Sequence, residues 1–209
     1  MNFAIMQSDE TIFEIHCVGD RILRKNAKNV TIFDENLEKF VRNMVVTMYA
    51  AAGIGLAAPQ VGESVKVVVV DVTSGLDGGE VCTFDGKEIL NIATIMPLCL
   101  INPVIKTRST QVCSQNEGCL SIPDFHGYVR RPRAVSLSFV DQYGGEHALA
   151  CDGILARCVQ HEIDHLAGKL YTDLLRPRDK KRFAKYLAER AETPSTKCNH
   201  GDGGAADDL

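Results

Sequence analysis

Two histidines four residues apart, His161 and His165, form the pattern in this sequence that is best suited to chemistry. Four residues make about one turn of an α-helix, so both imidazoles project from one face and can reach a single cation. Glu162 follows His161 in the string His-Glu-Ile-Asp-His, where its carboxylate can take a proton from a metal-bound water. The H-E-x-x-H pattern is typical of metal-dependent hydrolysis, and the alternative is a helix that carries two histidines by chance.

A catalytic metal site needs a third protein ligand and an open fourth position. Cys158 is poorly placed, because on a helix it would lie about 10 Å from His165 along the axis. Glu189, on a later predicted helix, would complete a protease-type zinc site. Cys119 stands in a Gly-Cys turn and would supply a thiolate that suits zinc or ferrous iron. A lone cysteine can equally be a core thiol, so the residues alone leave the third ligand open.

The composition is that of an ordinary globular chain. Its 209 residues are 45% hydrophobic and 24% charged, with a formal net charge of −4. These values fit one domain with a sizeable core and give no reason to expect DNA binding. The first ten residues do not resemble a signal peptide, and no apolar stretch reaches membrane-spanning length. The eight cysteines include no C-x-x-C pair and are interpreted as reduced thiols. We therefore predict a cytoplasmic protein with no membrane partner.

Hydrophobic periodicity predicts helices near both ends of the chain. One begins at the N-cap Asp34, buries an apolar stripe, and stops at Gly53. Another covers residues 179–192 and is amphipathic. Between them the motif helix opens at Asp152-Gly153 and ends at Gly168, and its apolar character on all sides predicts burial.

The strands are predicted from β-branched and alternating segments. Residues 66–73 and 98–107 each form a strand, and Pro103 confines the second to a sheet edge or a bulge. Residues 133–150 form a hairpin, and the long loop 74–98 holds a smaller one at Asp85-Gly86. Residues 117–123 are interpreted as a turn-rich stretch and residues 171–175 as extended chain.

We accordingly predict an α+β fold in which antiparallel strands surround a buried central helix carrying H-E-x-x-H, with an N-terminal and a C-terminal helix. Residues 1–192 are predicted to form a single catalytic domain, and the polar, glycine-rich residues 193–209 a disordered tail.

Three segments, taken together, resemble the signature of the peptide deformylase family. They are Gly-Ile-Gly-Leu-Ala-Ala-Pro-Gln at 53–60, Glu-Gly-Cys-Leu-Ser at 117–121, and His-Glu-Ile-Asp-His at 161–165. The resemblance extends from about residue 15 to residue 190. Two features depart from it: the 74–98 loop is longer than is usual, and His126 stands where many relatives carry an arginine that holds the substrate backbone.

The resemblance implies a role for each matched residue. Cys119, His161 and His165 bind the metal, and Glu162 acts as general base and then general acid. The Gln60 side-chain amide and the Leu120 backbone N–H stabilise the tetrahedral oxygen. The implied substrate-binding residues are Ile54, Gly55, Glu117, Gly118, Ile154 and Cys158.

The same resemblance implies the reaction and its participants. The enzyme would remove the formyl group from the N-terminal formyl-methionine of newly made polypeptides, using one divalent ion, ferrous iron with zinc or nickel as substitutes. The basic run at 176–185 is either a solvated helix face or a contact to the ribosome. Asp164, on a buried helix, needs a partner, for which we predict Arg131.

Two alternatives stay open at this point. One is a zincin-type metallopeptidase with Glu189 as ligand, in which replacement of Cys119 would leave the metal bound. The other is a catalytically silent metal-binding or ribosome-binding relative. The presence of Glu162 argues against the silent relative, because loss of that carboxylate is the simplest route to inactivity.

Overall fold

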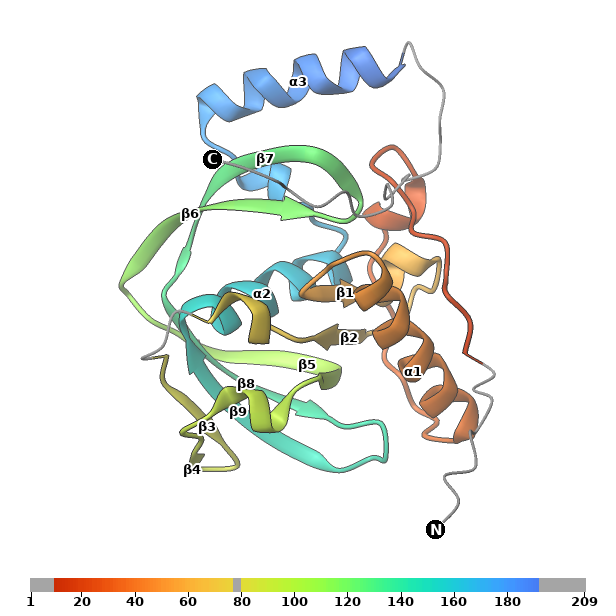
Figure 1. The fold of residues 1–209 in the computed structure, drawn as a ribbon, viewed down its shortest axis with the longest axis vertical. Helices are drawn as coiled ribbons and strands as arrows, with labels where there is room; N and C mark the ends of the chain where they lie inside the picture. The colour runs from red at the N-terminus through yellow and green to blue at the C-terminus, as the bar shows by residue number, and fades with distance from the viewer. Residues whose placement is uncertain (1–9, 77–79, 192–209) are drawn as a thin grey trace, which may run out of the picture.

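The computed structural model describes residues 10–76 and 80–191 (Figure 1). The predicted tail at 193–209 lies outside the described residues. Helices and antiparallel strands are mixed in one fold, as the sequence predicts. The helices are α1 (Glu35–Ala50), α2 (Gly153–Leu166) and α3 (Pro177–Ala191).

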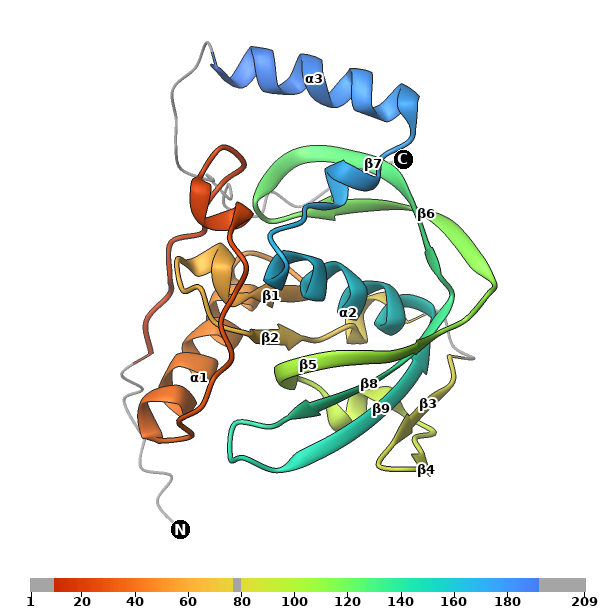
Figure 2. The ribbon, with the colours of Figure 1, turned by 180° about the vertical axis from the view of Figure 1, so that it is seen from behind.

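A seven-stranded sheet, antiparallel throughout, forms one layer. Its order is β1 (Gly55–Ala57), β2 (Val67–Val70), β5 (Leu98–Arg108), β8 (Ala134–Val140), β9 (Glu146–Asp152), β3 (Cys82–Phe84) and β4 (Lys87–Glu88). The second sheet is the pair β6 (Val112–Cys119) and β7 (Ile122–Pro132). Figures 1 and 2 show α2 between the two sheets and α1 at the β1 end of the larger one.

Strand β2 is buried on both faces, which explains its unbroken valine sequence. Val68 and Val70 join the core cluster that includes Leu155 and Val159 of α2. Val67 and Val69 join the cluster that includes the α1 residues Val41, Met44 and Met48. Alternate side chains of one strand thus support both helices.

Helix α1 begins where it was predicted to begin. The Asp34 carboxylate accepts a hydrogen bond from the Leu37 N–H at 3.0 Å. Its end differs slightly from the prediction, because Ala52, with φ of 52°, takes the left-handed position expected of Gly53. Gly53 is needed for another reason: a Cβ there would lie 2.7 Å from the Leu120 side chain.

The long loop contains the predicted small hairpin, in which Asp85 and Gly86 connect β3 to β4 with positive φ. The constraint predicted for Pro103 is met by a bulge, since the β5–β8 register shifts between Ile101 and Val104. Strand β5 itself lies inside the sheet, paired on both sides.

The β6–β7 hairpin corrects the sequence interpretation. Residues 117–123 are not merely a turn-rich stretch, because they contain the end of β6, the turn at Leu120 and Ser121, and the start of β7. Residues 171–175 also differ: Tyr171–Leu174 form a 3₁₀ helix, and the Asp173 carboxylate accepts from the Leu170 N–H at 3.0 Å. Both segments support the site from the side opposite the large sheet.

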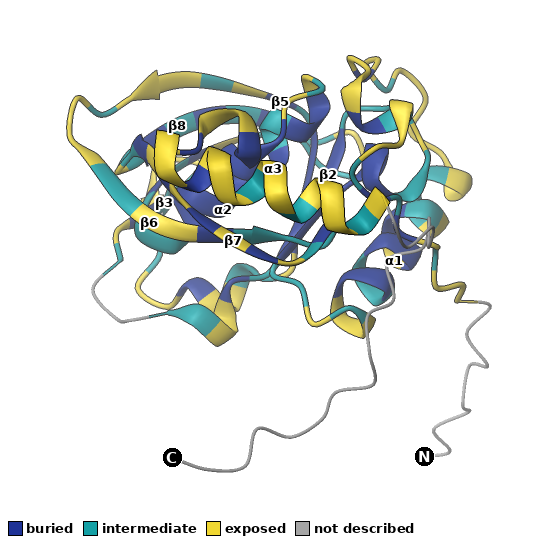
Figure 3. Cartoon of the chain, turned by 90° about the horizontal axis from the view of Figure 1, so that it is seen from above, coloured by how far each residue is buried: buried dark blue, intermediate teal, exposed yellow. Residues whose placement is uncertain are grey.

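Helix α3 packs on the outside of β7 and exposes most of its length (Figure 3). Phe183 and Tyr186 attach it, with ring centroids 5.1 and 5.3 Å from that of Phe125. Leu187, on the same helix, is 38% exposed.

None of the helices described is long and apolar enough to cross a membrane. Six cysteines are free thiols, as predicted: Cys82, Cys99, Cys113, Cys119, Cys151 and Cys158. Cys17 is disulfide-bonded, so the interpretation of all cysteines as reduced thiols is wrong for that residue.

Candidate active site

Helix α2 places His161 and His165 on one face, with ring centroids 5.1 Å apart. Both residues are buried, at 7% and 1% exposure. The apolar residues around the helix, among them Leu155 and Val159, anchor it against the sheet and fix the direction of the two rings.

Cys119 reaches the same point from the last residue of β6. Its Sγ lies 3.3 Å from His165 Nε2, and one ligand atom from each of Cys119, His161 and His165 lies within 4.8 Å of the others. A register shift between Glu117 and Cys119 precedes the turn and redirects this side chain out of the regular strand. One sulfur and two imidazole nitrogens form a donor set that fits zinc or ferrous iron.

The carboxylate of Glu117 fixes the orientation of His161. Its Oε2 lies 3.0 Å from His161 Nδ1, which leaves the other ring nitrogen toward Cys119. Arg131 donates to both Glu117 oxygens at 2.8 and 3.0 Å, and Arg157 donates to Oε1. Burial would raise the pKa of Glu117, but the bonds from His161 and Arg131 outweigh it and lower the pKa to about 2.

The same bonds act on His161 in the metal-free protein. Burial would lower its pKa, but hydrogen bonds with Cys119 and Glu117 raise the pKa to about 10. For His165, burial and the charge of His161 lower the pKa. A bound cation takes the place of a proton in such a group, so metal uptake would release protons.

Glu162 is 5% exposed, and its Oε2 has no hydrogen-bond partner among the described residues. Burial raises its pKa from 4.5 to about 7, although the nearby charges of His161 and Arg131 lower it in part. A carboxylate poised near neutrality is suited to both accept and donate a proton. Gly55 makes room for it, because a Cβ there would lie 2.5 Å from Glu162 Oε1.

Gln60 is held by its own loop and directed at the ligands. Its Oε1 accepts from the Ala57 N–H at 2.8 Å, which leaves the amide nitrogen to donate. That nitrogen lies 3.2 Å from Ser121 Oγ and 3.6 Å from Cys119 Sγ.

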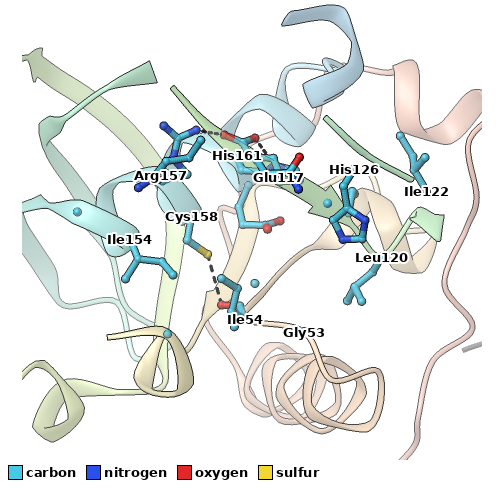
Figure 4. A pocket seen from close by; sticks show the side chains of 18 of the residues that line it. Gly53, Ile54, Glu117, Leu120, Ile122, His126, Ile154, Arg157, Cys158 and His161 are labelled. Carbon is cyan, nitrogen blue, oxygen red and sulfur yellow. Dashed lines mark hydrogen bonds and ion pairs between the residues drawn. The ribbon is translucent and has the colours of Figure 1, made fainter. Parts of the chain in front are cut away.

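These groups open into one cavity of about 1010 Å³ (Figure 4). Ile54, Ile154 and Cys158 lie on one side of it, away from His126 and Leu120. The sequence-predicted residues that line it are Ile54, Gly55, Gln60, Glu117, Gly118, Cys119, Leu120, Ile154, Cys158, His161 and Glu162. Of the predicted ligands, His165 does not line the cavity and is only 1% exposed.

Residues 12–181 match the family model described as polypeptide deformylase. The chain belongs to the peptide deformylase family. It is 41% identical over 173 residues to the peptide deformylase of Prochlorococcus marinus (strain MIT 9312), covering 83% of this chain and 78% of the relative.

Solved structures agree with this relationship. A peptide deformylase from Synechococcus elongatus in complex with actinonin matches with a TM-score of 0.73 and 38% identity, covering 88% of this chain and 90% of that one. One from Ehrlichia chaffeensis matches with a TM-score of 0.76 and 32% identity, covering 88% and 98%. The protein is a metal-dependent hydrolase of the deformylase type.

The position of Glu189 removes the basis for a zincin-type alternative. Its carboxylate pairs with Lys185 at 3.5 Å on the exposed α3 and is 63% exposed. It does not join the ligand cluster found among the described residues. Cys158 is also elsewhere, with its Sγ donating to the Ile54 carbonyl at 3.3 Å.

Two further outcomes concern the deformylase's supporting residues. The predicted partner of Asp164 is confirmed, since Arg131 Nη1 lies 2.7 Å from its Oδ2. Arg157 and Ser121 were missed by the sequence reasoning. The sequence feature that could have revealed Arg157 is its position among apolar residues of the motif helix, because a buried guanidinium requires an anionic partner.

Proposed function

We propose that this deformylase removes the formyl group from N-terminal formyl-methionine with Cys119, His161 and His165 as ligands of one divalent ion. The ligand cluster beside Glu162, whose buried Oε2 has no partner among the described residues, carries the proposal. When bound there, such a cation lowers the pKa of a water towards 7 and polarises the formyl oxygen. We propose ferrous iron as the ion, with zinc and nickel as substitutes.

Glu162 then moves the protons. It accepts one from the attacking water and returns it to the departing amine, so that the C–N bond breaks without an unprotonated leaving group. Its burial supports both steps, because desolvation disfavours the charged carboxylate and raises the pKa of Glu162 in the metal-free protein.

The oxygen that gains charge on the formyl carbon needs donors. The Gln60 amide nitrogen faces the ligand cluster, and the Leu120 N–H is proposed as the second donor. A donor of this kind contributes on the order of 3 kcal/mol to lowering the barrier. We assign Glu117 a positioning role through its side chain, because both carboxylate oxygens are already bound by His161, Arg131 and Arg157.

The substrate is proposed to lie along the cavity. Ile54, Ile154 and Cys158 would border the methionine side chain, while Gly55 and Gly118 let the peptide backbone approach. Strand β1 ends the seven-stranded sheet, so an extended peptide could pair with its outer edge.

We further propose that residues 1–192 act as one catalytic domain built around α2, and that the enzyme works in the cytoplasm on nascent chains. The exposed basic residues of α3 support contact with the ribosome. Arg182 contributes less than predicted to that surface, because it pairs with Asp179 at 2.8 Å.

Formate release from a formyl-Met tripeptide, measured anaerobically, tests the activity. Wild type should exceed Glu162→Ala by about 10²- to 10⁴-fold, the usual contribution of a general base. A wild type no faster than this variant, with both proteins folded and metal-loaded, would contradict the proposal.

A further inference from the structure

Gly75 and Ile154 approach each other closely in the cavity wall. Both line the cavity, Gly75 from the 3₁₀ turn Thr73–Gly75 and Ile154 from the first turn of α2. A Cβ built on Gly75 would stand 2.6 Å from Ile154 Cδ1, closer than real side chains approach. The turn and the isoleucine therefore touch only because residue 75 has no side chain.

The turn is held from several directions and has little freedom to move away. The Asp71 N–H donates to the Ile54 carbonyl at 2.9 Å, and Asp71 Oδ1 accepts from the Thr73 N–H at 3.0 Å. Tyr49 of α1 donates to Asp71 Oδ2. Val72, between these anchors and Gly75, is fully buried in the core.

The backbone of Ile154 is equally fixed, because the next residues, Leu155 and Ala156, are fully buried. Its side chain is half-buried and packs against the same core cluster, which leaves the cavity as the open direction. Any atom added at Gly75 would thus turn the Ile154 side chain into the cavity.

We propose that Gly75 is a specificity-determining residue: its missing side chain lets Ile154 withdraw and so sets the depth of the pocket for the first residue of the substrate. This rests on the proposed function, which places the methionine side chain beside Ile154. It gives the turn Thr73–Gly75, where the long loop begins, a role as a wall of that pocket.

The test compares Gly75→Ala with wild type on two peptides, formyl-Met-Ala-Ser and formyl-Ala-Ala-Ser. The φ of Gly75 lies outside the left-handed region, so alanine imposes no backbone strain there. We expect the variant to lose about tenfold in kcat/KM on the methionine peptide through KM, and little on the alanine peptide, since one methylene in an apolar pocket changes selectivity by about 10-fold or more. Ser74→Ala, an exposed change in the same turn, is the matched control and should leave the ratio unchanged.

A second substitution shows whether the effect passes through Ile154. Ile154→Val removes the conflicting Cδ1, so adding it to Gly75→Ala should restore most of the ratio, with the coupling read from a double-mutant cycle. By itself Ile154→Val should raise the relative rate on formyl-Phe-Ala-Ser, an outcome that does not depend on the folding of Gly75→Ala.

Three results would overturn the inference. One is a folded Gly75→Ala enzyme with the wild-type ratio, and another is a changed ratio that Ile154→Val fails to restore. The third is an Ile154→Val enzyme with no gain on the phenylalanine peptide. A wild type that releases no formate from any of the peptides would instead refute the proposed function, and this inference with it.

Discussion

Glu162, the proposed general base, is a buried side chain whose ionised form opposes folding. The unfolded chain would lose this proton near pH 4.5, whereas the folded, metal-free protein holds it to about pH 7. Folding therefore takes up a proton between these values, and the contribution of this group to stability falls as the pH rises through that window. A shift of this size corresponds to about 3 kcal/mol.

Glu162→Gln should accordingly be inactive and yet more stable. In metal-stripped protein at pH 8 we expect a gain of up to about 3 kcal/mol in the free energy of unfolding by urea, because the neutral amide avoids burying a charge. The gain should vanish below pH 4.5, where the Glu162 carboxyl is protonated in both the folded and the unfolded wild type. Equal stability of variant and wild type at pH 8 would show that the carboxylate is not disfavoured in the fold.

The Cys119 thiolate distinguishes the proposed metal centre from the zincin-type site, in which Glu189 would be the third ligand. Cys119→Ser should lower metal affinity by more than the roughly 10- to 100-fold that loss of a supporting residue costs, because a ligand atom itself is lost. Metal content after dialysis against graded chelator measures this. Glu189→Gln is the control and should retain the metal, and the reverse pattern would contradict the assignment.

At the scale of elements, the small hairpin β3–β4 is fastened by a histidine between two carboxylates. His147 Nδ1 lies 2.7 Å from Asp85 Oδ2, and Nε2 lies 3.1 Å from Asp141 Oδ2. Both contacts need a ring N–H, so the cationic form binds best. The hydrogen bond to Asp85 is the main reason that the pKa of His147 is raised above 6.5, and burial opposes it.

The stability of this attachment should depend on the pH. Because the folded pKa of His147 is raised, its stabilisation is complete below pH 6.5 and disappears as the pH rises through the folded value. Asp85, in the β3–β4 turn, and Ala148, on β9, donate their N–H groups to each other's oxygens, and the amide-exchange protection of both should decrease over that range. His147→Gln should show low protection at every pH, and a wild type with constant protection would refute the prediction.

The elements also show what can be predicted from sequence. The motif helix and β2 were predictable because their apolar patterns are local and nearly unbroken. The β6–β7 hairpin was not, although the inward residues of β7 do alternate. Two of those inward positions are Gly127 and Arg131, so the alternation is not one of hydrophobicity. At Gly127 the Leu175 side chain leaves no room for a Cβ, and the charge of Arg131 is neutralised by Glu117. Both contacts exist only after folding.

The site was predictable to a similar degree. His161 and Glu162 belong to one short motif, but Cys119 could be linked to them only through the resemblance of three segments. The part played by Arg157 comes from a contact with Glu117 across 40 residues, and no local pattern records it.

At the scale of the whole molecule, α3 is an outer element that presents positive charge. Lys180 and Lys181 are exposed, whereas Arg182 is engaged with Asp179 and lies 5.5 Å from the Phe125 ring. Reversing charge at Lys180 and Lys181 should therefore remove surface charge without disturbing the attachment of the helix.

We expect Lys180→Glu/Lys181→Glu to weaken co-sedimentation with ribosomes and to reduce its salt dependence, since each lost phosphate contact lowers the slope by about one. Formate release from a free tripeptide should be unaffected, because the active-site cavity lies on the other side of β7. Lys87→Glu, a single charge reversal on β4, serves as a control away from α3. Unchanged sedimentation of the double variant would show that the basic face of α3 is a solvated helix face and does not contact the ribosome.

The position of β1 at the end of its sheet has a broader implication. If the substrate pairs along that edge as proposed, the main-chain bonds would not depend on the side chains beyond the first residue, and the enzyme would treat a great variety of proteins alike. Selectivity would then be concentrated in the one pocket proposed for the first side chain, which is what a step acting on many different nascent chains requires.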